Sequence, residues 1–140
     1  MNTDPASKSF IRFIPAVARI LMGAPLLVFG ANLFLNFIPP PSSPMPEKAA
    51  AFTGALVATG YMMPLIGITQ LLVGAFLVTN RFVPLALVLF APFILNSIAF
   101  HVILAPSGLA PAAVFLALEL YLAWVYRAAY RPLLTARAAR

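Results

Sequence analysis

The stretch Phe82–Leu104, FVPLALVLFAPFILNSIAFHVIL, contains twenty-three residues and no Asp, Glu, Lys or Arg. As an α-helix it would extend about 34 Å, which exceeds the roughly 30 Å hydrocarbon core of a bilayer. Its polar side chains lie in the second half, at Asn96, Ser97 and His101. Because polar atoms in hydrocarbon need hydrogen-bond partners, we expect this edge of the helix to face protein and to line a site between helices.

The composition of the whole chain indicates an integral membrane protein. Of 140 residues, 63% are hydrophobic and 9% are charged, and the mean hydropathy is +1.00. Soluble domains carry far more charge. The absence of cysteine excludes disulfides and thiolate chemistry within the chain. The single histidine means that haem held by two histidines would require a second chain.

The hydropathy pattern predicts an all-α membrane protein, a four-transmembrane-helix up-down bundle with a short periplasmic helix after the first span. The Pro-rich segment 39–46 cannot be helical and separates the first span from the short helix. The short helix could instead extend the next span. The expected helices cover residues 13–38, 47–59, 61–79, 82–104 and 111 to about 126 or 130. The chain then divides into a cytoplasmic N-terminal segment 1–12, a transmembrane domain 13–130 and a basic cytoplasmic tail 131–140.

Two pairs of glycines share a seven-residue spacing. Gly23 and Gly30 lie on one face of the first expected span, and Gly67 and Gly74 lie on one face of the second. Small residues allow membrane helices to approach closely, so these faces are expected to pack against neighbouring helices.

Positive charge is distributed unequally between the two sides of such a bundle. The only basic residue on the side of the Pro-rich segment is Lys48, and Arg19 is expected to snorkel toward the opposite side. The basic residues expected on that opposite side are Lys8, Arg12, Arg81, Arg127, Arg131, Arg137 and Arg140. The positive-inside rule therefore predicts that both termini are cytoplasmic, as in a multi-pass protein of the bacterial inner (plasma) membrane. The net charge of +6 is attributed to orientation and to attraction to anionic lipids, and not to nucleic-acid binding.

Ionisable groups inside a membrane are costly and mark candidate sites. Arg19 and Glu119 lie on neighbouring helices of the expected bundle, so they could pair, with Gln70 and Asn96 as hydrogen-bond partners. The functional interpretation is a ligand-binding pocket formed by these four residues and His101, with Glu119 as a proton acceptor. The structural alternative is a buried polar clamp that fixes helix register.

A second polar group is expected near the outer end of the bundle. Asn32 and Asn36, one turn apart, should reach the same depth as Ser97 and His101. These residues could form a polar mouth in which His101 exchanges protons with the periplasm. The alternative is an interfacial histidine bonded to loop backbone.

Known catalytic patterns are missing from the sequence. It contains no Gly-rich phosphate loop and no HExxH, and its only Asp is Asp4, which rules out a Ser–His–Asp triad inside the membrane. Glu119 has no second carboxylate with which to share acid–base work. We therefore predict no catalytic residues and no metal ligands. The sequence gives poor support for self-contained catalysis and is compatible with a non-catalytic subunit of a quinone-linked oxidoreductase.

The order and spacing of many short segments resemble the DoxX family of small bacterial membrane proteins, from about Ala18 to Leu134. The segments that carry the resemblance are Phe29-Gly30-Ala31-Asn32, Phe37 with the Pro-rich loop, Ala50-Ala51-Phe52, Gly60-Tyr61-Met62-Met63-Pro64-Leu65, Asn80 to Leu87, Ala91-Pro92, Asn96, Phe100-His101, Pro106-Ser107-Gly108, Leu118-Glu119-Leu120-Tyr121 and Tyr126-Arg127.

This resemblance implies a four-helix membrane bundle without a tightly bound cofactor. Members of the family are linked to quinone-coupled sulfur oxidation and to membrane redox complexes that handle oxidative stress. The sequence departs from the family at Gln70, where a glutamate is common. The loss of that carboxylate weakens a proton-relay role and favours a neutral, hydrogen-bonding pocket.

The leading functional expectation is an accessory or ligand-binding subunit of a membrane redox system that binds a quinone or another small apolar molecule with a polar end. The expected partners are membrane lipids, redox-enzyme subunits and further copies of the chain. One alternative is a small-molecule or lipid transporter that works as an oligomer, since four spans are few for alternating access. A second is a membrane isomerase, which would need facing acidic residues that this sequence lacks.

Overall fold

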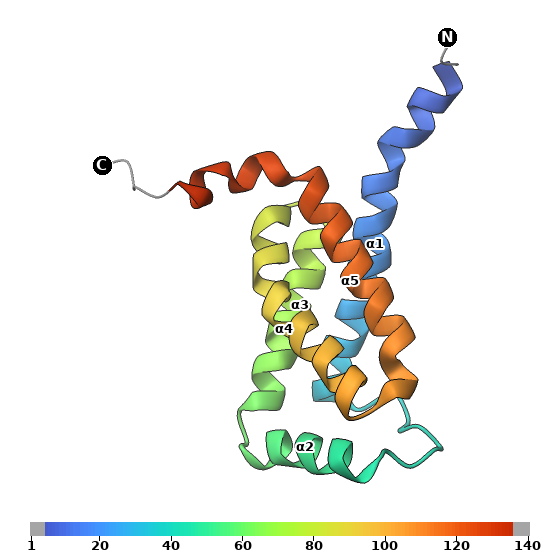
Figure 1. The fold of residues 1–140 in the computed structure, drawn as a ribbon, viewed down its shortest axis with the longest axis vertical. Helices are drawn as coiled ribbons and strands as arrows, with labels where there is room; N and C mark the ends of the chain where they lie inside the picture. The colour runs from blue at the N-terminus through green and yellow to red at the C-terminus, as the bar shows by residue number, and fades with distance from the viewer. Residues whose placement is uncertain (1–4, 136–140) are drawn as a thin grey trace.

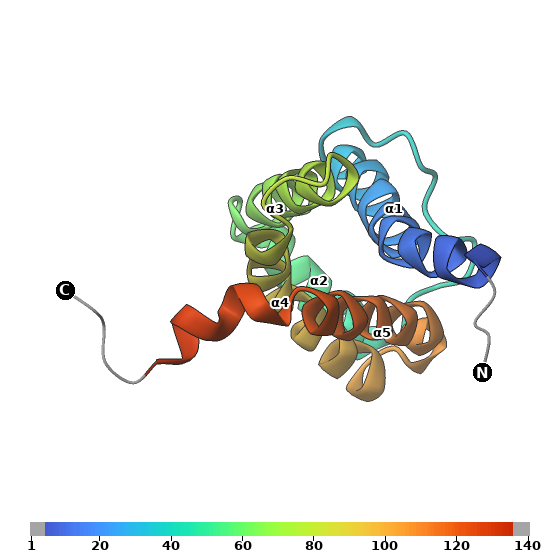
Figure 2. The same cartoon turned by 90° about the horizontal axis from the view of Figure 1, so that it is seen from above.

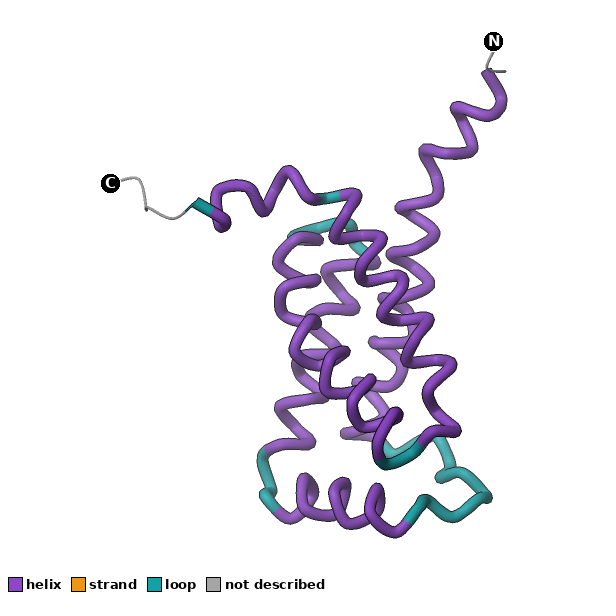
Figure 3. Tube along the Cα trace, in the orientation of Figure 1, coloured by secondary structure: helices purple, strands orange, loops and turns teal. Residues whose placement is uncertain are grey.

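The computed structural model describes residues 5–135, with side chains from Phe13 onward, and every regular element in that range is helical (Figures 1 and 3). This confirms the all-α prediction. The elements are α1 (Pro5–Leu35), α2 (Glu47–Ala58), α3 (Met62–Val78), α4 (Val83–Ile103), the 3-10 turn η1 (Pro106–Gly108), α5 (Leu109–Val125) and η2 (Arg127–Leu134).

Helix boundaries differ from the predicted ones at both ends of α1. The helix begins at Pro5, so residues 5–12 are helical and precede the candidate span, which begins at Phe13. It ends at Leu35, where Asn36 adopts a left-handed φ of 49°. The Asn32 side chain then accepts a 2.7 Å hydrogen bond from the Ile38 amide, which closes the end of the helix. Residues 136–140 of the predicted basic tail lie outside the described range.

Three helical segments are long and apolar enough to cross a membrane: 13–35 in α1, 83–103 in α4, and 106–125 across η1 and α5. A fourth crossing results if the bent pair α2 and α3 counts as one span. Large hydrophobic side chains also lie exposed along the outside of the bundle, including Leu21, Leu95 and Leu120. A soluble protein rarely exposes so extensive an apolar surface, whereas a lipid-facing surface requires it.

Helix α2 lies across one end of the bundle, and its axis makes a 90° angle with that of α3 (Figure 1). The chain turns at Gly60, whose φ of +73° is accessible to glycine at little cost. The Thr59 hydroxyl accepts a 3.1 Å hydrogen bond from the amide of Met62, the first residue of α3. The predicted short helix is therefore an element of its own, bent by 90° from α3.

The glycines pair across the α1–α3 interface. A Cβ added to Gly23 would lie 3.1 Å from the Gly74 carbonyl oxygen. A Cβ added to Gly30 would lie 3.1 Å from the Gly67 carbonyl oxygen. Gly23 faces Gly74 and Gly30 faces Gly67, so the two helices run antiparallel. The close approach of the backbones is the packing that the seven-residue spacing predicts.

Viewed from above, α1, α3, α4 and α5 surround a shared interior (Figure 2). Helix α1 packs on α3 and α5, and α4 packs on the same two helices, so the four form a closed ring. The interior half nearer the termini is filled by Met22, Leu77 and Leu122, each fully buried. The half nearer α2 is less completely filled, and the candidate site lies there.

Candidate functional site

A cavity of about 290 Å³ lies between the four helices. Its walls come from α1, α3, α4, η1 and α5 and are mainly aromatic and aliphatic, while three polar side chains also reach it. The lining residues are Leu26, Phe29, Gln70, Phe90, Phe93, Ile94, Ser97, His101, Gly108, Pro111, Ala112 and Phe115. An apolar cavity with a few converging polar groups is typical of a small-molecule site.

Gln70 supplies the most deeply buried polar group of the cavity. The residue is 8% exposed, and its Oε1 atom has no hydrogen-bond partner within the described part of the chain. Its position on α3 is fixed by the glycine interface, because its Cβ lies 3.1 Å from where a Cβ on Gly30 would be. A buried amide oxygen without a donor is costly, so it is available to a ligand that offers a hydroxyl or N–H group.

His101 lines the cavity from the last turn of α4. Its Nδ1 atom lies 3.0 Å from the Ala105 carbonyl oxygen. In the neutral ring this contact requires Nδ1–H to donate, which leaves Nε2 as an acceptor. The ring packs directly on the backbone of Gly108, where any side chain would overlap it. The α4–η1 turn therefore fixes the position of the imidazole, and Ser97 lies one turn earlier on the same wall.

Two aromatic rings form the inner end of the cavity. Phe90 and Phe115 have ring centroids 6.3 Å apart, and both line the cavity. Glu119 follows Phe115 by one helical turn, so it lies beyond this end and is absent from the lining. Glu119 is 5% exposed, and its Oε2 atom has no hydrogen-bond partner in the described chain.

The Glu119 carboxyl group lies on the side of the bundle nearer to η2. Tyr130 in η2 donates a 3.2 Å hydrogen bond to the Pro84 carbonyl. Burial raises the pKa of the Tyr130 hydroxyl, and the negative charge of Glu119 raises it further. The Tyr130 hydrogen bond therefore ties η2 to the start of α4, at the end of the bundle opposite α2.

Arg19 is bonded to α5, but not through Glu119. Its Nη1 atom donates a 2.8 Å hydrogen bond to the Tyr126 hydroxyl, and its Nε atom is buried without a partner among described residues. Tyr126 is the residue directly after α5, seven positions beyond Glu119. The hydrogen bond joins the first and last long helices, as a structural clamp would, and Arg19 does not reach the cavity.

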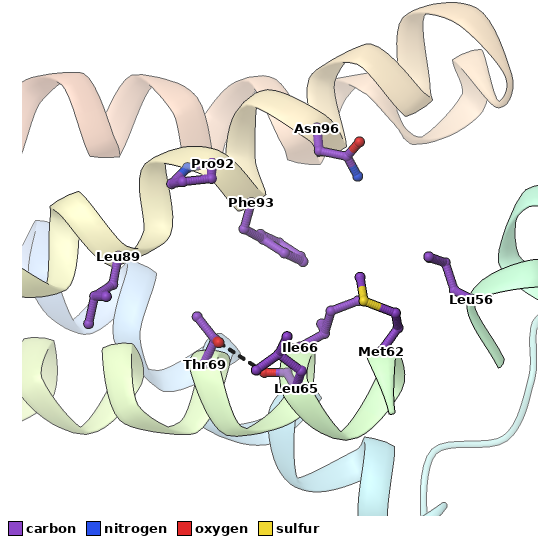
Figure 4. A pocket seen from close by; sticks show the side chains of 9 residues that line it. All are labelled: Leu56, Met62, Leu65, Ile66, Thr69, Leu89, Pro92, Phe93 and Asn96. Atoms are coloured by element: carbon purple, nitrogen blue, oxygen red, sulfur yellow. Dashed lines mark hydrogen bonds between the residues drawn. The ribbon is translucent and has the colours of Figure 1, made fainter. Parts of the chain in front are cut away.

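Asn96 faces a second space, a lateral groove of about 310 Å³ between α2, α3 and α4 (Figure 4). The groove is lined by Leu56, Met62, Leu65, Ile66, Thr69, Leu89, Pro92, Phe93 and Asn96. The Thr69 hydroxyl donates a 2.9 Å bond to the Leu65 carbonyl, so it is satisfied within its own helix. Asn96 is consequently the polar side chain of the groove that offers free hydrogen-bonding atoms.

The structure thus divides the sequence-predicted residues among four places. Gln70, His101 and Ser97 share the cavity, while Asn96 lines the groove. Glu119 and Arg19 lie deeper toward the other end of the bundle. The predicted mouth does not assemble as a unit, because Asn32 closes the end of α1 and the exposed Asn36 forms the turn that follows.

Sequence reasoning did not identify the aromatic lining. Phe90, Phe93 and Phe115 shape the cavity, yet each occurs in a helix that is apolar on every side. Such helices lack the contrast between polar and apolar faces from which orientation is predicted. Gly108 also lines the cavity, beside the His101 ring. The sequence predicted only that Gly108 belongs to a turn.

No group of three or more His, Cys, Asp or Glu that could hold a metal ion occurs among the described residues. No protein-family model matches this sequence, and neither the curated proteins nor the solved structures gave a match. The functional interpretation therefore rests on the cavity and on the sequence pattern.

Proposed function

We propose that this chain is a DoxX-like integral membrane protein that binds a quinone or a chemically similar molecule, as an accessory subunit of a membrane redox system. The observation that carries the proposal is the cavity between the four helices, in which Gln70, Ser97 and His101 interrupt an aromatic and aliphatic wall. A flat ring with polar oxygens matches both features of this lining.

In this proposal four helices cross the bacterial inner membrane in an up-down arrangement with both termini cytoplasmic. Helix α3 has 17 residues and would extend about 26 Å, near the lower limit for a span. Its residues are on average about as hydrophobic as those of α4, and it packs between α1 and α4 in the ring. Helix α2, at the opposite end from the arginine-containing η2, then lies at the periplasmic surface.

The polar groups of the cavity would hold two different parts of a quinol or quinone. In the neutral form of the His101 ring, Nε2 can accept a hydrogen bond from a quinol hydroxyl, as can the Oε1 atom of Gln70. The Gln70 amide N–H groups and the Ser97 hydroxyl donate to quinone carbonyls. The lining can therefore satisfy both oxidation states while supplying no redox group of its own, which suits a binding subunit.

Ligand copurification tests the proposal. The protein, purified in a mild detergent from bacterial membranes, is extracted with organic solvent, and quinone is measured by its ultraviolet absorbance. We expect quinone in the extract and an upward thermal shift when a short-chain benzoquinone is added to the protein, since a ligand that binds the folded state stabilises it.

A double variant, Gln70→Leu with His101→Leu, provides the control, because it keeps the cavity apolar while removing two of its polar groups. Quinone recovery should fall in this variant and stay unchanged in Leu120→Ala, which alters a lipid-facing side chain of α5. Absence of both quinone and thermal shift in the unaltered protein would contradict the proposal.

A further inference from the structure

We infer that the cavity and the lateral groove form one binding site for a tailed amphiphile, with the polar ring held at Gln70 and His101 and the hydrocarbon tail leaving between α3 and α4 beneath α2. This inference rests on the proposed function and specifies its ligand class: a ring compound that carries a long hydrocarbon chain.

The two spaces share a wall. Phe93 lines both the cavity and the groove, and Ser97 lines both the cavity and a smaller hollow that continues the groove toward Phe52. The ring of Phe93 contacts that of Phe90, with centroids 5.3 Å apart, and Figure 4 shows it directed into the groove from α4. Rotation of this one side chain would connect the two spaces.

The chemistry of the groove fits a hydrocarbon chain. Its lining is apolar apart from Asn96 and the internally bonded Thr69. Leu65 and Leu89, on opposite sides of the groove, are 52% and 37% exposed, so the groove opens on the surface that faces lipid. Helix α2 covers its outer end through Leu56, a consequence of the 90° bend at Gly60.

The size of the cavity explains why a tail must leave it. A volume of about 290 Å³ lies near the lower end of small-molecule sites, which run from roughly 300 to 1,000 Å³. The cavity is therefore suited to a ring and not to a long chain. Because lipid is as apolar as the groove, the tail gains little affinity there, and the groove acts mainly as the route by which the tail reaches lipid.

A matched pair of variants tests the route. Leu89→Trp fills the groove, whereas Leu95→Trp adds the same bulk to the same helix at a position that lines neither space and is 63% exposed. The dissociation constants of a tail-less dimethoxy-methyl-benzoquinone and of its decyl-tailed analogue are measured for each protein in nanodiscs.

We expect Leu89→Trp to weaken binding of the tailed quinone at least about tenfold, which corresponds to roughly 1.4 kcal/mol, and to change binding of the tail-less ring less than about twofold. Leu95→Trp should leave both constants unchanged. Equal affinities of Leu89→Trp and the unaltered protein for the tailed quinone would overturn the inference while leaving the proposed function intact. If neither quinone binds the unaltered protein, the inference and the proposed function are both overturned.

A second measurement does not depend on the folding of any variant. A quinone with a photoreactive diazirine at the end of its decyl tail is cross-linked to the unaltered protein, and the labelled peptides are identified by mass spectrometry. Labels should fall in α2 and α3 near Leu56 and Met62 or in α4 near Leu89. Labels confined to the outer face of α1 around Val17 and Leu21 would place the tail elsewhere and reject the route.

Discussion

At the scale of single residues, Gln70 is the side chain at which stability and binding are opposed. Its amide oxygen is buried without a donor, and the residue packs against the α1 backbone at Gly30. A buried polar group without a partner calls for an explanation, and in the proposed function a ligand in the adjoining cavity supplies the missing donor.

We predict that Gln70→Leu stabilises the unliganded protein by about 1 kcal/mol, because it removes an unsatisfied polar group at similar volume. The same change should weaken quinone binding by about fivefold, since a neutral hydrogen bond contributes on the order of 1 kcal/mol and the ligand loses its partner. Thermal unfolding in detergent with and without quinone measures both effects. A loss of stability with unchanged affinity would show that Gln70 has a structural role only.

His101 provides a second prediction, about hydrogen bonding. Its Nδ1 atom lies 3.0 Å from the Ala105 carbonyl oxygen, so in the neutral ring Nε2 is the atom that can accept a hydrogen bond from a quinol. We expect His101→Leu to weaken binding of a short-chain quinol by about fivefold, because a neutral hydrogen bond contributes about 1 kcal/mol. Titration of the detergent-solubilised protein with the quinol measures the loss. An affinity equal to that of the unaltered protein would remove His101 from ligand binding.

At the scale of helices, the glycine contact between α1 and α3 positions one wall of the cavity. A Cβ on Gly74 would lie 2.8 Å from the Gly23 carbonyl oxygen, which belongs to a backbone that cannot rotate away. By contrast, a Cβ on Gly67 meets the ring of Phe34, a side chain that can move. An added methyl group at Gly74 would therefore push the α1 backbone away, whereas one at Gly67 would displace only the Phe34 side chain.

We predict that Gly74→Ala destabilises the protein by about 2 kcal/mol through overpacking and separation of the two helices. Gly54→Ala in α2 is the control, because nothing lies within 4 Å of its added Cβ and helix propensity favours alanine by roughly 1 kcal/mol. Thermal unfolding in the same detergent compares them. Equal melting temperatures for Gly74→Ala and the unaltered protein would show that this contact contributes little.

At the scale of the whole molecule, the number of membrane crossings depends on whether the 17-residue helix α3 spans the bilayer. Three spans would place the termini on opposite sides of the membrane, whereas four place them on the same side. The absence of native cysteines makes labelling of single introduced cysteines unambiguous.

We predict that Ser43→Cys, in the Pro-rich connector, reacts with a membrane-impermeant maleimide in spheroplasts. Cysteines at Asn80, between α3 and α4, and at Thr135 should react only after the membrane is opened, because basic residues hold that side in the cytoplasm. Labelling of Asn80→Cys from outside would show that α3 does not cross, and the four-span proposal would fail.

The sequence by itself determined the helical class and the presence of the long apolar segments, and it predicted a short helix after the Pro-rich segment. These follow from hydropathy over long windows and from proline and glycine positions, which are local properties of the chain. It also singled out Gln70, Ser97 and His101, because polar residues in an apolar helix are conspicuous whatever surrounds them.

Only the tertiary structure decided which of those residues meet. It placed Asn96 in the groove, bonded Arg19 to Tyr126 and left Glu119 beyond the Phe90–Phe115 end of the cavity. The physical reason is rotation: a helix that is apolar on every side can turn about its axis at little cost in lipid. Its orientation is then set by close contacts with its neighbours, such as Gly23 on Gly74, which no single segment of sequence contains.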